Sequence, residues 1–278
     1  MQVIVLGSGS PIPHPERAGP STLVRTVAGD LLFDCGRGVL MRAAAAGSGA
    51  AAFRALFLTH LHSDHITDLN DIYTMRWAMS FQPAPLAVYG PVGTATLLAA
   101  TEAMLEPDIG YRLAHHDDLQ WRPAAAVSEV EQGVVFALDA VRVTAAPTDH
   151  APVRPTVGYR IEDGDHSVVI AGDTVPCDGL DLLCRDADVL VHTVVRRDLI
   201  EQFGLPRLTD VLDYHSSVPD AAQTAERNGV GTLLLTHLVP APAPGTEQEW
   251  IDQAKAHFGG EVIVAADLLT LEVGGVRE

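Results

Sequence analysis

Short apolar runs that end at glycine, proline or a polar cluster recur along the first half of the chain. Their length and their Val, Leu and Phe content are typical of buried strands, and Ala28-Gly29-Asp30 between two of them indicates a hairpin turn. Strands are expected over residues 2–6, 21–27, 31–35 and 53–58. Helices are expected over residues 37–46, before Gly47, and from Ile66 to Trp77, where large apolar side chains recur at three- and four-residue steps.

The second half of the chain changes from closely spaced strands to an alternation of helix and strand. Strands are expected over residues 127–130, 134–138, 141–145, 157–161, 168–171, 188–192, 231–236 and 262–265, and helices over residues 180–185, 219–228 and 246–258. No low-complexity linker divides the sequence. We therefore predict an α/β protein of two β-sheets packed face to face with helices outside, built as a single domain over residues 1–278.

Composition narrows the class of protein. The chain has 18 basic and 36 acidic residues, a formal charge of −18, and 47% hydrophobic residues. It is too apolar to be disordered, and too acidic for a protein that grips the phosphates of a nucleic acid with surface Lys and Arg. Three cysteines outside any CxxC pair imply no disulfide framework. Without a signal-peptide pattern or a membrane-length apolar segment, we expect a cytoplasmic protein that does not enter a membrane.

The segment Thr59-His60-Leu61-His62-Ser63-Asp64-His65 carries the strongest chemical signal. It follows a predicted strand directly and precedes a predicted helix. Its side chains can bind metal ions, and clustering them has a desolvation cost that no packing gain offsets. In extended backbone His60 and His62 point to the same side and can share one metal ion, whereas the turn into the helix moves Asp64 and His65 toward a second one.

Three further candidate ligands lie where predicted strands end, namely His150, Asp173 and His237. Each by itself is more often a capping or surface residue. Open sheets gather their ligands at the carboxyl ends of strands, so the shared placement of the three favours one common site. The sequence therefore predicts a site for two metal ions.

These segments resemble the metallo-β-lactamase superfamily, whose fold is a four-layer αββα sandwich of two mixed sheets around a dinuclear zinc site. The resemblance implies that one metal ion is held by His60, His62 and His150. It implies that the other is held by Asp64, His65 and His237, and that Asp173 bridges the two. Zinc is the preferred metal, although Mn²⁺ or Fe²⁺ would accept the same ligands. The cysteine ligand of many true β-lactamases is absent, so antibiotic hydrolysis is not expected.

Within the superfamily the sequence is most similar to the ribonuclease Z and arylsulfatase-like branch. The likeness is carried by Leu6-Gly7-Ser8-Gly9-Ser10-Pro11, Asp34-Cys35-Gly36, Gly172-Asp173-Thr174 and Tyr214-His215-Ser216-Ser217. It implies that His215 stands beside the metal ions without binding them and protonates the leaving group. The alternative, that His215 caps the helix expected near Pro219, stays open at this point.

Two departures from ribonuclease Z direct the expected substrate toward a small molecule. The short interval from His150 to Asp173 leaves no room for the long arm with which bacterial ribonuclease Z clamps the tRNA elbow. Thr193 stands where that family usually carries glutamate. We therefore expect a hydrolase of a small phosphodiester or sulfate ester, with no nucleic acid as partner. A homodimer would be in keeping with this branch.

In the predicted mechanism a hydroxide that bridges the two metal ions attacks the ester. Asp64 orients this nucleophile and accepts its proton, and His215 donates a proton to the departing alkoxide. One alternative is a lactonase or other carboxylic-ester hydrolase, which needs no His215. Another is a tRNA 3′-processing endonuclease like ribonuclease Z, which His215 favours and which the charge and the missing arm disfavour. A redox diiron protein and a non-catalytic metal protein are less well supported, because His62 and every other expected ligand are present.

Overall fold

The computed structural model describes residues 1–274, which form two β-sheets of seven strands each. The strands of the first sheet are β1 (Gln2–Gly7), β2 (Ser21–Thr26), β3 (Gly29–Phe33), β4 (Phe53–Phe57), β5 (Leu86–Gly90), β6 (Ala125–Glu129) and β14 (Thr270–Glu272). Those of the second sheet are β7 (Gly133–Leu138), β8 (Val141–Pro147), β9 (Val157–Asp163), β10 (His166–Ile170), β11 (Val189–Val195), β12 (Thr232–Val239) and β13 (Glu261–Val264).

Both sheets are mixed. The first has the spatial order β14-β1-β2-β3-β4-β5-β6 and the second the order β13-β12-β11-β10-β9-β8-β7. Each contains an antiparallel meander, β1-β2-β3 in one and β7-β8-β9-β10 in the other, that continues into parallel strands linked by helical crossovers. The expected hairpin at Ala28-Gly29-Asp30 joins β2 to β3.

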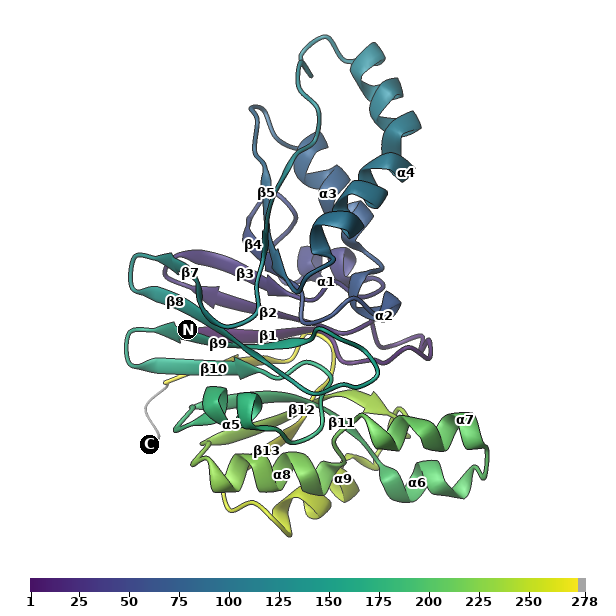
Figure 1. The fold of residues 1–278 in the computed structure, drawn as a ribbon, viewed down its shortest axis with the longest axis vertical. Coiled ribbons are helices and arrows are strands. Elements are labelled where there is room, and N and C mark those ends of the chain that lie inside the picture. Colours follow the sequence, from purple (N-terminus) through teal and green to yellow (C-terminus); the bar gives the residue numbers. More distant parts are fainter. Residues whose placement is uncertain (275–278) are drawn as a thin grey trace.

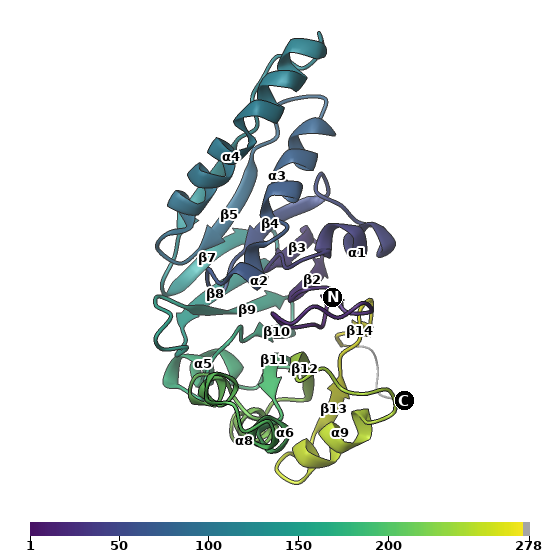
Figure 2. The same ribbon diagram turned by 90° about the vertical axis from the view of Figure 1, so that its right-hand side faces the viewer.

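Helices cover the outer face of each sheet (Figure 1), which makes the four layers of an αββα sandwich. On the side of the first sheet lie α1 (Val39–Ala45), α2 (Ser63–Ile66), α3 (Leu69–Ala78) and α4 (Thr94–His115). On the side of the second lie α5 (Asp178–Cys184), α6 (Arg197–Gln202), α7 (Pro206–Thr209), the short 3₁₀ helix η1 (Asp210–Asp213), α8 (Val218–Arg227) and α9 (Glu247–Lys255). Helices α3 and α4 extend beyond the sandwich in both views (Figure 2). The predicted fold class is confirmed.

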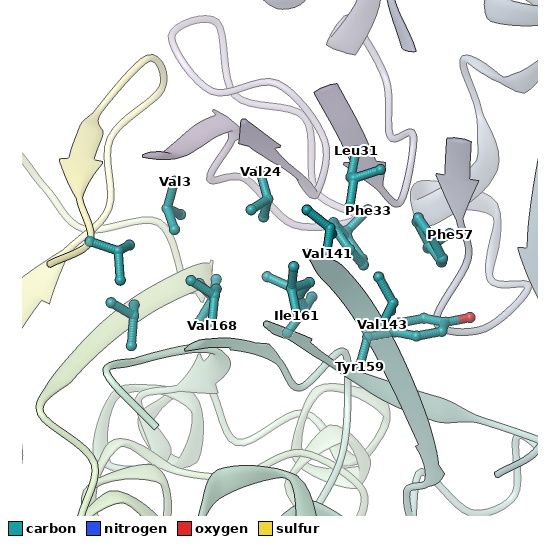
Figure 3. Packing of buried hydrophobic residues seen from close by; sticks show 14 of the residues in the cluster. Val3, Val24, Leu31, Phe33, Phe57, Val141, Val143, Tyr159, Ile161 and Val168 are labelled. Atoms are coloured by element: carbon teal, nitrogen blue, oxygen red, sulfur yellow. The ribbon is translucent and has the colours of Figure 1, made fainter. Parts of the chain in front are cut away.

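Strand alternation divides the apolar residues between the layers. In β1, Val3 and Val5 face the second sheet, whereas Ile4 and Leu6 face the helices on the outside. Figure 3 shows the resulting core between the sheets, where side chains from both meet, among them Val24, Leu31, Phe33, Phe57, Val141, Val143, Tyr159, Ile161 and Val168. The sheets are thereby fixed to one another, and so are the loops that leave their edges.

The structure differs from the predicted elements in several places. The helix expected from Ile66 to Trp77 is broken into α2 and α3, because the Asp68 carboxylate between them accepts hydrogen bonds from the backbone of Gly38 and Leu40 at the start of α1. Strands β5 and β14 and helices α4, α6 and α7 were not expected. Among residues 1–274, no helix combines the length and apolarity that crossing a membrane would require.

Candidate metal centre

The predicted ligands come from separate strands of both sheets and meet in one place. His60, His62, Asp64 and His65 follow β4, while His150 follows β8. Asp173 follows β10 and His237 lies in β12. The structure gathers these side chains into two groups, each with its ligand atoms within 4.8 Å of one another, namely His60, His62, His150 and Asp173, and Asp64, His65 and His237.

The backbone after β4 explains the division of the motif between the groups. His62 is still extended, with φ −64° and ψ 146°, and helix α2 begins at the next residue. The imidazoles of His60 and His62 therefore lie on one side, with 3.1 Å between Nε2 of the first and Nδ1 of the second. The first turn of α2 carries Asp64 and His65 into the other group, as expected from the sequence.

His237 reaches the site from inside a strand. The sequence suggested that it follows an apolar strand, but β12 continues through it to Val239. The pairing of β12 with β11 shifts register at this point, and His237 has a φ of +49°, the conformation of a β-bulge. The bulge places Nε2 of His237 3.3 Å from Oδ2 of Asp64.

Asp173 occupies the centre of the site. Its Oδ2 atom lies 3.3 to 3.9 Å from a ring nitrogen of each of His60, His65, His150, His215 and His237. The preceding Gly172 has a φ of +66°, and a Cβ atom there would lie 2.8 Å from Cβ of Thr59. Glycine is therefore required for the loop after β10 to bring Asp173 against the motif.

Asp34, a residue of the Asp34-Cys35-Gly36 segment whose role the sequence did not indicate, supports both groups from behind. One of its oxygens lies 2.8 Å from Nδ1 of His65 and accepts a hydrogen bond from the Thr59 hydroxyl, while the other accepts from the Thr59 backbone N–H. The same hydroxyl lies 3.0 Å from Nδ1 of His60. Asp34 thus fixes the ring orientation of one histidine in each group, directly or through Thr59.

His215 stands at the rim of the site. Its Nδ1 donates to the carbonyl of Val211 at 2.9 Å, and its Nε2 lies 3.3 Å from Oδ2 of Asp173. Helix α8 is capped by Ser217 and Asp220 in a reciprocal capping box. The alternative that His215 caps this helix is therefore wrong. The Thr193 hydroxyl donates a hydrogen bond to the Gly172 carbonyl, next to Asp173.

Burial and neighbouring charges shift the pKa values of the site residues in different directions. Burial lowers the pKa of His60 well below its usual value, and burial lowers that of His150 to about 4, so both rings are neutral near pH 7. Burial alone would raise the pKa of Asp173, but the charges of His237 and His65 hold it well below its usual range. Burial would lower the pKa of His65, but the Asp173 and Asp34 carboxylates raise it well above its usual value. The site thus presents the neutral imidazoles of His60 and His150 beside an ionised Asp173 carboxylate.

Several buried polar atoms of the site have no hydrogen-bond partner among the described residues. They include Nε2 of His65 and Oδ1 of Asp173. A buried polar atom without a partner costs free energy, so buried atoms that converge in this way indicate a site built to bind a ligand. Imidazole and carboxylate donors suit divalent zinc, iron or manganese. The residues present therefore fit a pair of divalent metal ions.

Comparisons with known proteins agree with this architecture. Residues 30–238 match the family described as "Beta-lactamase superfamily domain". The chain is 54% identical to ribonuclease Z of Mycobacterium bovis (strain BCG / Pasteur 1173P2) and 52% identical to that of Mycobacterium tuberculosis (strain ATCC 25618 / H37Rv), in each case over 98% of both chains. Among solved structures it is similar to the metallo-β-lactamase fold protein YhfI from Bacillus subtilis, with 25% identity, a TM-score of 0.73, and coverage of 98% of this chain and 99% of the other.

The relatives overturn the expectation that nucleic acid is not a partner and that the substrate is a small molecule. Proteins that match this chain over 98% of both lengths are ribonucleases, so the short interval between His150 and Asp173 does not separate it from them. The net charge of −18 was the other reason for expecting no nucleic-acid partner. This reasoning was misleading, because the net charge sums the whole surface and does not describe the electrostatic field at one site.

Two independent observations now coincide, a cluster of seven converging His and Asp side chains and a full-length match at 54% identity. The prediction of a metal-dependent hydrolase that acts on ester bonds is confirmed. The chain belongs to the ribonuclease Z family of the metallo-β-lactamase superfamily.

Proposed function

We propose that this protein is a tRNA 3′-processing endonuclease that cleaves a phosphodiester bond of precursor tRNA. The observation that carries the proposal is the placement of His215, a histidine directed at the centre of the site but outside both ligand groups. Cleavage of an RNA phosphodiester expels an alkoxide, a strongly basic leaving group that needs a proton donor. The 54% identity to ribonuclease Z supports the same substrate.

Seven side chains would hold two divalent cations, and zinc is the ion we expect. The first would be bound by His60, His62 and His150, and the second by Asp64, His65 and His237. Asp173 lies within reach of both groups and would bridge them. When bound, the two cations supply Lewis acidity and lower the pKa of a water molecule toward neutrality.

The remaining chemistry belongs to the side chains. Asp64 presents its Oδ2 between His65 and His237, at 3.6 and 3.3 Å, where it can orient the attacking water and accept its proton. His215 delivers a proton from Nε2 to the leaving oxygen, because its Nδ1 is occupied by the Val211 carbonyl. These two residues serve the two proton transfers of the reaction, removal from the attacking water and donation to the leaving oxygen.

A substrate panel tests the proposal. Purified protein loaded with Zn²⁺ is given precursor tRNA with a 3′ trailer, bis-p-nitrophenyl phosphate, an aryl sulfate and a homoserine lactone. We expect a single cut in the precursor at the 3′ side of the acceptor stem, and no cut by Asp173→Asn. The matched control is Asp139→Asn, an exposed carboxylate in the turn between β7 and β8, which should retain full activity. An intact precursor alongside hydrolysis of the lactone or sulfate would refute the proposal.

A further inference from the structure

A cavity of about 530 Å³ adjoins the metal centre. Three parts of the chain form its walls, namely the loop after β1, the segment from Val195 to His215 that contains α6, α7 and η1, and the end of β12. His215 and His237 belong both to this cavity and to the metal centre. The cavity therefore opens onto the metal centre.

The residues that line the cavity are largely apolar. Ile12, Ile200, Leu208 and Val211 make it largely aliphatic, and Phe203 adds an aromatic ring. None of the described residues that line it is acidic, although the chain as a whole carries a charge of −18. The cavity accordingly suits a flat, apolar group attached to an anion, with the Arg207 guanidinium as a cationic contact.

The position of His215 determines which end of the substrate the cavity receives. Val211, which lines the cavity, holds Nδ1 of His215 at 2.9 Å, and the ring of His215 itself forms part of the wall. A general acid lies beside the oxygen that departs. Whatever is attached to that oxygen must therefore extend into the cavity beside His215, and in an RNA chain this is a ribose with its base.

We propose that this cavity is a nucleobase subsite, which takes the base of the nucleotide whose ribose oxygen leaves. This assignment rests on the proposed function and specifies its substrate, because it requires an unpaired nucleotide next to the scissile phosphate. Apolar and aromatic walls accept a base without reading its hydrogen-bonding edge. The subsite therefore tolerates different bases but requires that one be present, and Arg207 contacts a neighbouring phosphate.

The test uses two precursor tRNAs that differ in one position, where the nucleotide on the leaving-group side carries either its base or an abasic ribose. We expect the wild-type protein to lose about tenfold or more in kcat/KM when the base is removed. Phe203→Ala, which opens the cavity, and Leu208→Trp, which fills it, should lower kcat/KM for the base-bearing RNA and leave that for the abasic RNA unchanged.

The matched control is Leu205→Ala. Leu205 is 56% exposed, close to the 54% of Phe203, and lies in the same segment without lining the cavity. It should behave like the wild type on both RNAs. Equal cleavage of the two RNAs by the wild type, or an equal loss on both in the cavity variants, would overturn the subsite alone. Failure to cut either RNA, with bis-p-nitrophenyl phosphate still hydrolysed, would refute the proposed function and the subsite with it.

Discussion

His215 has both of its ring nitrogens committed, Nδ1 to a backbone carbonyl and Nε2 toward Asp173. Because it lies outside the ligand groups, its removal should affect proton transfer and not metal binding. We predict that His215→Ala lowers kcat for RNA by roughly 10²- to 10⁴-fold while the metal content stays that of the wild type. Single-turnover cleavage and elemental analysis on the same preparation provide the two measurements.

The leaving group supplies the control for this variant. An aryl diester expels a weakly basic phenolate that needs little protonation, so His215→Ala should slow bis-p-nitrophenyl phosphate hydrolysis far less than RNA cleavage. Equal losses on both substrates would contradict the general-acid role. A drop in metal content would instead place His215 among the ligands.

Asp34 is predicted to act on the metal ions only through the histidines that it orients. Its carboxylate orients His65 directly and His60 through Thr59. Because such supporting carboxylates tune the ligands they hold, Asp34→Ala should weaken metal affinity about 10- to 100-fold, as measured by competition with a chelator. Excess metal should restore activity to Asp34→Ala but not to Asp173→Asn. Unchanged affinity would show that the Asp34 contact is only structural.

At the scale of single residues, the sequence predicted which side chains would converge at the site but not the residues that support them. The converging side chains are recognisable because their types and spacing are unusual. The partner of His215 is the carbonyl of Val211, which every residue type would offer, so no side-chain pattern could indicate it. The bulge at His237 was hidden for a related reason, since it depends on the register between β12 and β11.

Among the elements, α6 supports the wall of the cavity through an ion pair at its start. Arg196, whose guanidinium is nearly buried, donates to Asp198 in the first turn of α6 and also contacts Glu249 of α9. These hydrogen bonds from Arg196 lower the pKa of Asp198 to about 2. The Asp198 carboxylate is 46% exposed, so solvent reduces the strength of the pair.

We predict that Asp198→Asn lowers the free energy of unfolding by about 0.5 kcal/mol at pH 7. The sign follows from the lowered pKa, since the carboxylate stabilises the fold only while it is ionised. The difference between wild type and variant should thus be constant above about pH 5 and shrink as the pH falls through 4 toward 2. Urea titrations across this range measure it, and a difference that grows on acidification would contradict the assignment.

Most strands were predicted because burial on both faces gives short continuous apolar runs, as in β1 and β4. Helix α4 was missed for a physical reason. It has Pro107 in its interior, and few of its side chains are buried, among them Leu98, Thr101 and Ile109. Its buried residues recur at helical spacing, but the proline and the largely exposed surface weaken the amphipathic pattern from which helices are predicted.

The metal centre joins the two halves of the molecule. The motif after β4 belongs to the first sheet, whereas His150, Asp173 and His237 belong to the second. Metal binding should consequently stabilise the native fold as a whole, since it occurs only when both sheets are in place. Chelation should lower the melting temperature by roughly 5 to 15 °C, reversibly on adding Zn²⁺. A melting temperature that chelator leaves unchanged would contradict this coupling.

On the whole-molecule scale, net charge was the weakest guide. The excess of acidic residues led to the wrong partner, because the cavity beside the metal centre is lined by no described acidic residue. That the chain forms one domain remains a prediction from the absence of linkers. The positions of the charged residues, and not the net charge of the chain, determine which anions can approach the site.

The central claim is that seven side chains from both sheets form one two-metal hydrolytic site. A metal titration of activity tests it most directly, in which chelated protein receives Zn²⁺ in steps while cleavage of precursor tRNA is followed. We predict no cleavage without metal and a plateau at two equivalents per chain. Full activity in the metal-free protein, or a plateau at one equivalent, would contradict it.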